Sequence, residues 1–159
     1  MAEQRGTDSK REPVSLDSAA THILEECRMV LPGIQALFGF QLIAVFNDGF
    51  GEKLSSGQQQ LHFVALILVA LSAGLVMAPA AVHRQSQQRA VSERFIWLSS
   101  WLLLFSMFPL AVGLSVDVYL IGRIVFEAEA ASVLFAGGLF IILMLLWLAL
   151  PRRERKLND

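Results

Sequence analysis

The sequence predicts an all-α protein, an integral membrane four-helix bundle. Three observations carry this prediction. Hydrophobic residues make up 55% of the 159 residues and charged residues only 17%, and the mean hydropathy of +0.55 lies outside the range of ordinary soluble domains. The apolar residues form runs of about 20, the length that crosses a bilayer as a helix. The charges collect at the termini and between the runs.

We expect one transmembrane domain over residues 15–151, with its helices joined up-down-up-down by short connections. The four spans are expected at about 24–46, 61–82, 95–121 and 131–150. The polar segment 1–14 buries too little apolar surface to fold and is expected to be a disordered tail. A helical pattern begins at Ser15, with Ser15 or Asp17 as N-cap, and is expected to lie on the membrane surface. The segment 47–60 has the composition of a turn-rich connector, and a basic tail, 152–159, ends the chain.

The first span holds polar groups well inside an apolar run. Arg28, Pro32, Gln35 and Gly39 fall at i, i+4, i+7 and i+11 and therefore share one helix face. Because an unpaired polar group in hydrocarbon costs several kcal/mol, we expect this face to point at protein. Gln35 would then bond across helices to Ser106 or to a freed carbonyl, or contact a substrate or water. Arg28 would either form an ion pair in the bundle or extend to the lipid headgroups.

The third span carries a second stripe of polar and small residues that we expect to face inward. Ser99, Ser106, Gly113 and Asp117 lie at i, i+7, i+14 and i+18. Asp117 is the one acidic residue in the apolar part of the second to fourth spans, so it would bind a proton or a cation, or would be capped by water near the surface. The candidate ion or polar path consists of Asp117, Gln35, Ser106 and Arg28.

Small residues mark the surfaces where helices are expected to approach closely. Ala70, Gly74 and Ala78 recur at every fourth position of the second span, the spacing that lets two helix backbones come together in lipid. Gly39 and Gly113 are expected to play the same role on the first and third spans. The Ala70, Gly74 and Ala78 face would pair with a second copy of the chain, or would be used inside the monomer against the first or fourth span.

The distribution of basic residues predicts the orientation. Eleven of the 13 Lys and Arg residues fall in the N-terminal part, in the 83–96 segment or in the C-terminal tail, and the other two connections hold one each. Basic residues accumulate on the cytoplasmic side of a membrane protein. We therefore expect both termini in the cytoplasm, N-in and C-in.

Several functional classes are not expected. No nucleophile elbow, phosphate-binding loop, zinc-protease motif or dinucleotide fingerprint occurs, so the chain is not expected to be an enzyme. The single cysteine, Cys27, and the scattered histidines His22, His62 and His83 have no further ligands at metal-site spacing, so neither a metal nor another cofactor is expected. There is no basic patch with interleaved aromatic residues, so nucleic acid is not an expected partner.

Four short stretches resemble a known group of proteins. They are RMVLPGIQALF at 28–38, FVAL at 63–66, the Ala-Pro to His-Arg stretch at 78–84, and WLALPR at 147–152. They are similar to a group of small bacterial four-span proteins of unknown function, some of which carry an automatic label of sodium/proton antiporter. The resemblance implies a bacterial inner-membrane protein and a small proton or cation transport protein.

Three functional hypotheses follow from different classes. The first is a small transport protein whose facing polar stripes line a narrow path. The second is a non-catalytic structural or interaction subunit that docks on a larger membrane complex through its small-residue faces and places its basic tail at anionic lipids. The third is a sensor whose cytoplasmic segments bind a soluble partner. The small number of intramembrane charges favours the second hypothesis, and the resemblance favours the first.

Overall fold

The computed structural model describes residues 15–85, 92–126 and 128–149, and within these ranges every regular element is a helix. The elements are α1 (Leu16–Val45), the short α2 (Asp48–Lys53), α3 (Ser56–Gln85), α4 (Glu93–Phe126) and α5 (Glu129–Met144), which continues as a π-helical turn (Leu145–Ala149). The expected tails 1–14 and 152–159 lie outside the described residues. The all-α fold class predicted from the sequence is confirmed for the part that the structure describes.

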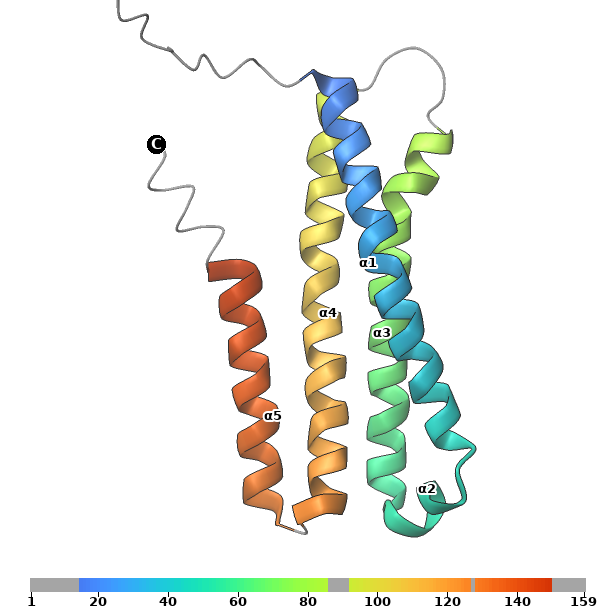
Figure 1. Ribbon diagram of the computed structural model, residues 1–159, viewed down its shortest axis with the longest axis vertical. Coiled ribbons are helices and arrows are strands. Elements are labelled where there is room, and N and C mark those ends of the chain that lie inside the picture. Colours follow the sequence, from blue (N-terminus) through green and yellow to red (C-terminus); the bar gives the residue numbers. More distant parts are fainter. Residues whose placement is uncertain (1–14, 86–91, 127, 150–159) are drawn as a thin grey trace, which may run out of the picture.

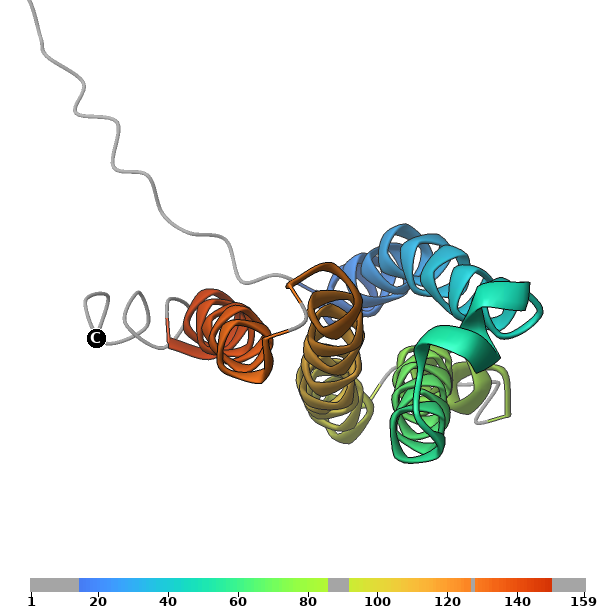
Figure 2. The ribbon, with the colours of Figure 1, turned by 90° about the horizontal axis from the view of Figure 1, so that it is seen from below.

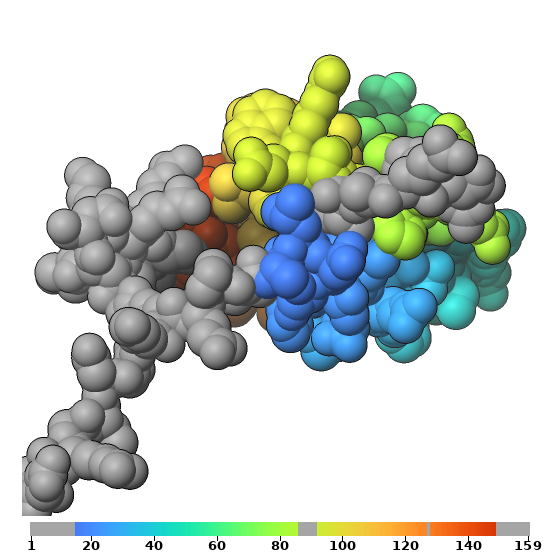
Figure 3. Space-filling model, turned by 90° about the horizontal axis from the view of Figure 1, so that it is seen from above, coloured from blue at the N-terminus to red at the C-terminus, as the bar shows by residue number. Residues whose placement is uncertain are grey.

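The four long helices run antiparallel in succession (Figure 1). Helices α1, α3 and α4 pack against one another, whereas α5 lies along α4 on the side away from α3 (Figure 2). The arrangement is therefore a three-helix core with α5 at its edge, and not four helices around one axis. Figure 3 looks onto the end where α1 and α4 begin, and shows their first turns next to each other. The opposite end carries α2, and we call it the α2 end.

Serine side chains cap the starts of three long helices. Ser15 accepts a hydrogen bond from the backbone N–H of Ser18 at the start of α1. At the start of α3, Ser55 and Gln58 form a reciprocal capping box, in which each backbone N–H donates to the side-chain oxygen of the other residue. Ser92 accepts from the backbone N–H of Phe95 at the start of α4. These caps satisfy N–H groups that have no partner within their own helix.

The long helices extend beyond several of the expected limits. The segment from Ser15 is not a separate surface helix, because α1 continues without a break from Leu16 to Val45. The expected connector at 47–60 contains α2, which begins where the side chain of Asn47 accepts a hydrogen bond from the backbone N–H of Gly49. Cap residues therefore set these helix starts, which the apolar runs alone do not locate.

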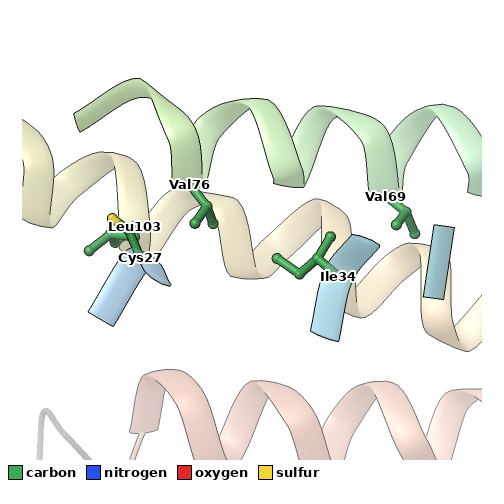
Figure 4. Packing of buried hydrophobic residues seen from close by; sticks show 5 residues of the cluster. All are labelled: Cys27, Ile34, Val69, Val76 and Leu103. Atoms are coloured by element: carbon green, nitrogen blue, oxygen red, sulfur yellow. The ribbon is translucent and has the colours of Figure 1, made fainter. Parts of the chain in front are cut away.

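The core of the bundle is apolar and lies among α1, α3 and α4. Its buried members are Cys27 and Ile34 from α1, Val69 and Val76 from α3, and Leu103 from α4 (Figure 4). Helix α1 contributes through a line of residues spaced by seven, namely Ala20, Cys27, Ile34 and Gln41. The expectation that the face of Arg28, Pro32, Gln35 and Gly39 points into the bundle is wrong. The side chains of the first three residues are exposed, and Gly39 is half-buried next to open space.

The physical reason is the position of each line of residues around α1. Each step along an α-helix turns the side chain by about 100°, so Arg28 and Gln35 lie about 100° from their neighbours Cys27 and Ile34. The helix buries the apolar line, and the polar line is turned away from the core. Within the described chain, Gln35 therefore has no role in holding the three core helices together.

Small residues set two close contacts between helices. A Cβ atom added at Gly113 on α4 would lie 2.9 Å from Cγ2 of Val69 and 3.2 Å from the backbone oxygen of Ala65, so this glycine is needed for the approach of α4 to α3. A Cβ at Gly122 would lie 3.1 Å from the Cβ of Ser132, which brings α5 onto α4. The predicted packing role of Gly113 is thus visible in the structure, whereas Gly122 was not predicted.

The inward stripe predicted for the third span is also present. Ser99, Ser106 and Gly113 are buried on α4 and Asp117 is half-buried. The Ala70, Gly74 and Ala78 face of α3 behaves differently, because Gly74 is exposed with open space at its Cβ position and the two alanines are half-buried. Within the described chain, no other helix packs closely against Gly74 on this face.

Four helices are long and apolar enough to cross a membrane: Leu16–Val45, Ser56–Gln85, Glu93–Phe126 and Glu129–Leu148. Large apolar side chains cover their outer surfaces, including Phe40 at 72% exposed, Phe63 at 62% and Leu134 at 72%. Soluble monomers rarely expose apolar patches on this scale. The fold therefore suggests a membrane protein.

Candidate functional site

Three polar side chains from three different helices meet near the α2 end. Gln41 lies near the end of α1, His62 near the start of α3, and Asp117 in the second half of α4. Because the long helices alternate in direction (Figure 1), these three positions fall at the same end of the bundle. We call them the Gln41–His62–Asp117 cluster.

The cluster is connected by short polar contacts. Nε2 of Gln41 donates to Oδ2 of Asp117 at 2.6 Å. Nε2 of His62 lies 3.1 Å from the backbone oxygen of Gln41, and Nδ1 of His62 lies 3.4 Å from Oδ1 of Asp117. Gln41 and His62 are only 4% and 6% exposed. The ring of Phe50 from α2 packs edge-on against the imidazole of His62, with the ring centroids 5.2 Å apart.

The contacts of His62 fix which of its nitrogens carries a proton. A carbonyl oxygen can only accept, so Nε2 must carry the hydrogen that is donated to Gln41. In a neutral imidazole, Nδ1 is then an acceptor, and it faces a carboxylate oxygen that is also an acceptor. A proton on either atom of this pair removes the repulsion, giving an imidazolium beside a carboxylate or a neutral imidazole beside a carboxylic acid. The geometry thus allows His62 and Asp117 to share one proton between Nδ1 and Oδ1.

Two buried oxygen atoms in the cluster lack a hydrogen-bond donor among the described residues. They are Oε1 of Gln41 and Oδ1 of Asp117. Nδ1 of His62 lies within ion-pair distance of Oδ1 and attracts it only when the imidazole carries a second proton, and no hydrogen bond joins the two atoms. An unsatisfied buried acceptor costs about 1–3 kcal/mol. The cluster is thus arranged to accept a proton, a cation or a donor group from a ligand.

A pocket of about 430 Å³ adjoins the cluster between α1, α2, α3 and α4. Gln41, His62 and Asp117 form part of its wall, and Lys53 of α2 is the one lysine or arginine that lines it. The remaining wall is mainly apolar and comes from α1, α2 and α4. The apolar residues are Leu37, Phe40, Ala44, Phe50, Leu54, Leu120, Ile121 and Ile124. A volume of this size is typical of small-molecule sites.

The structure brings only one of the four residues of the predicted polar path into this cluster, namely Asp117. Ser106 lies 11 residues earlier on α4, which is about 16 Å along a helix, and its hydroxyl donates to the backbone oxygen of Leu103 at 2.7 Å. The backbone oxygen of Ser106 accepts from the hydroxyl of Ser72 at 2.8 Å. Ser106 therefore joins α3 to α4. Gln35 and Arg28 are exposed on α1.

Gln41 and His62 were not among the predicted site residues, although the sequence holds signals for both. Gln41 continues the seven-residue line of Ala20, Cys27 and Ile34 that α1 buries. In an antiparallel arrangement, the end of the first span, the start of the second and the end of the third fall together. A histidine or glutamine at those places is then a candidate neighbour of Asp117.

The cluster does not resemble a transition-metal centre. Within 15–85, 92–126 and 128–149, no group of three or more His, Cys, Asp or Glu side chains is close enough to hold a metal ion. A single carboxylate matches a proton or a singly charged cation better than a divalent ion, which usually takes several oxygen ligands. Farther along the bundle from the cluster, the interior is filled by the apolar core of Figure 4.

A family model described as a family of unknown function, DUF6328, matches residues 10–151. The chain belongs to this family. Membership in DUF6328 confirms the expected relationship to an uncharacterised family, and the match carries no sodium/proton antiporter description. No curated protein and no solved structure matches the chain. The function of this DUF6328 member is therefore argued from the cluster and the pocket.

Proposed function

We propose that this chain is a multi-pass protein of a bacterial inner membrane, with both termini in the cytoplasm, that binds and transports a proton or a small cation. Four helices of sufficient length and hydropathy support the membrane location. The excess of Lys and Arg in the N-terminal part, the 83–96 segment and the C-terminal tail supports the orientation. In this orientation the α2 end and its pocket face away from the cytoplasm.

The observation that carries the proposal is the buried contact between Asp117 and His62. Ionisable residues inside membrane spans are costly, and they are usually found where an ion or proton passes. Here the carboxylate has one oxygen held by Gln41 and the other next to Nδ1 of His62. A proton or a singly charged cation at that second oxygen compensates the negative charge and relieves the acceptor–acceptor contact.

The apolar core explains how leakage is prevented. Cys27, Ile34, Val69, Val76 and Leu103 form an apolar core among α1, α3 and α4, whereas Asp117 lines the pocket at the α2 end. This core would block a polar path from Asp117 along the bundle. Transport then requires a second state in which this core opens and the pocket closes. Alternation between two such states is the general behaviour of secondary transporters.

Proteoliposomes that contain the purified full-length chain test the proposal. A pH gradient or a sodium gradient is expected to drive proton or sodium flux, and Asp117→Asn is expected to abolish that flux while the protein stays folded. Glu129→Gln is the matched control, because it also removes one carboxylate charge but lies exposed at the start of α5, outside the pocket. Flux through Asp117→Asn equal to that of the parent chain contradicts the proposal.

A second candidate function is a structural or interaction subunit of a larger membrane complex. It is favoured by the Ala70, Gly74 and Ala78 face of α3, where Gly74 has open space at its Cβ position. A second copy of the chain or another membrane protein would pack there through close backbone contact. In native gels of bacterial membranes, the parent chain would then migrate as a complex, and Gly74→Leu would migrate as a monomer. Monomer migration of both chains contradicts this candidate.

A further inference from the structure

We propose that the pocket beside the Gln41–His62–Asp117 cluster binds a primary ammonium ion that carries an apolar tail. The head group would be held by the polar cluster and the tail by the apolar wall of the pocket. This inference rests on the cation site at Asp117 proposed above, and it names the chemical class of the cation. It does not require that the ligand is transported.

The primary ammonium head group is inferred from the hydrogen-bond acceptors of the cluster that have no donor. Oε1 of Gln41 and Oδ1 of Asp117 have no donor among the described residues, and Nδ1 of His62 is an acceptor whenever the ring is neutral, because Nε2 is the donor to Gln41. A primary ammonium has three N–H donors and no acceptor. Its single positive charge also matches the single carboxylate of the cluster. A quaternary ammonium has the same charge but no N–H donor, and an alcohol has a donor but no charge.

The apolar tail is inferred from the apolar residues that make up the rest of the pocket wall. Leu37, Phe40 and Ala44 lie along one side on α1, and Leu120, Ile121 and Ile124 come from α4. An inorganic cation would leave this apolar surface and most of the 430 Å³ volume unused. An alkyl chain attached to the ammonium would occupy it, and each methylene group moved out of water should tighten binding by up to about fourfold.

Lys53 restricts the charge that the ligand can carry. It is the one lysine or arginine that lines the pocket, it lies on α2, and it is exposed. A ligand with a second positive charge would be repelled by the ammonium group of Lys53 on the pocket wall. The pocket should therefore prefer monoamines to diamines of the same length.

Isothermal titration of the full-length chain in lipid nanodiscs, with empty nanodiscs as the blank, tests this inference. The probes are octylammonium, octyltrimethylammonium, octanol and 1,8-diaminooctane. Octylammonium is expected to bind at least tenfold more tightly than the other three, and Asp117→Asn is expected to remove that preference. Lys53→Gln should reduce the difference in affinity between octylammonium and 1,8-diaminooctane, because it removes the positive charge of Lys53 from the pocket wall.

The alternative outcomes separate the possible occupants. Equal affinities for octanol and octylammonium would show that the pocket is an apolar groove that accepts any alkyl chain, including a lipid tail. This result overturns the proposal. Equal binding of octyltrimethylammonium shows that charge alone is recognised, which overturns the assignment of a primary ammonium. Proton or sodium flux without octylammonium binding overturns this inference alone. Octylammonium binding without any inorganic flux leaves the inference standing and overturns the transport of inorganic cations.

Discussion

Nδ1 of His62 on α3 lies 3.4 Å from Oδ1 of Asp117 on α4, and the other ring nitrogen of His62 reaches the backbone oxygen of Gln41 on α1. One imidazole thus connects three helices and is the residue that faces the carboxylate. The contact explains why a carboxylate is kept among apolar helices. It also makes His62 the most informative residue to change after Asp117.

We expect His62→Gln to lower proton flux strongly while the chain stays folded. Glutamine can still donate a hydrogen bond to the backbone oxygen of Gln41, but it cannot hold a proton between α3 and Asp117. The measurement is proton flux in proteoliposomes, together with helix content by circular dichroism. His22→Gln is the control, because the His22 side chain is 71% exposed, lies 3.7 Å from Glu25 and does not line the pocket. If proton flux is unchanged in His62→Gln, His62 only holds the helices together and takes no part in proton transport.

Two glycines with opposite surroundings give the next prediction. Gly113→Ala would place a methyl group 2.9 Å from Val69 and 3.2 Å from the backbone of Ala65, and overpacking of this kind typically costs about 1–3 kcal/mol. Gly74→Ala meets open space and should not destabilise the monomer, because alanine favours helix more than glycine does. The free energy of unfolding in mixed micelles distinguishes the two variants. Equal stability of both would contradict the close contact between α3 and α4.

The sequence predicted the four long helices because each apolar run is long and holds few charged residues. It also predicted the inward stripe of α4, since Ser99, Ser106 and Gly113 lie between bulky residues that have to face outward. It failed on α1, where two lines of residues compete for burial. Burying the polar line with Arg28 and Gln35 satisfies one amide, but burying the line with Cys27 and Ile34 packs more apolar side chains against α3 and α4. The second effect determines the structure.

Of the three cluster residues, the sequence predicted only Asp117. The other two are distant from it in the sequence and meet it only in the folded structure. Gln41 and His62 are each the kind of residue that occurs at helix ends, and neither has a neighbour at ligand spacing in the sequence. Their partner, Asp117, is 76 residues away from Gln41 along the chain. Only the antiparallel packing of α1, α3 and α4 brings them together, and the pocket depends further on α2, which composition did not predict.

The hydrogen bond between Ser72 and Ser106 should contribute measurably to stability. Ser72 is fully buried and its hydroxyl donates to the backbone oxygen of Ser106 at 2.8 Å. Hydrogen bonds between membrane helices are worth about 0.6–2 kcal/mol, so Ser72→Ala should lower the free energy of unfolding by that amount. Gln35→Leu should leave the stability of the monomer unchanged, because the Gln35 side chain is exposed.

The comparison of Ser72→Ala with Gln35→Leu also tests how α1 is rotated. If Gln35→Leu costs about 1 kcal/mol while Ser72→Ala costs nothing, the amide of Gln35 faces a neighbouring helix. The burial of Cys27 and Ile34 described above would then be incorrect. A loss in Gln35→Leu that grows with protein concentration would instead show that Gln35 is paired across two copies of the chain.

The proposed orientation is tested by labelling cysteines at the two ends of the bundle. Ser55 lies exposed between α2 and α3, and Gln85 lies exposed at the end of α3. In spheroplasts, a membrane-impermeant maleimide should label Ser55→Cys directly, and it should label Gln85→Cys only after the membrane has been permeabilised. The parent chain gives the background, which should be low because Cys27 is 5% exposed. The reverse labelling pattern would place the α2 end in the cytoplasm. The pocket beside Asp117 would then open toward the cytoplasm, and the side of cation access proposed above would be inverted.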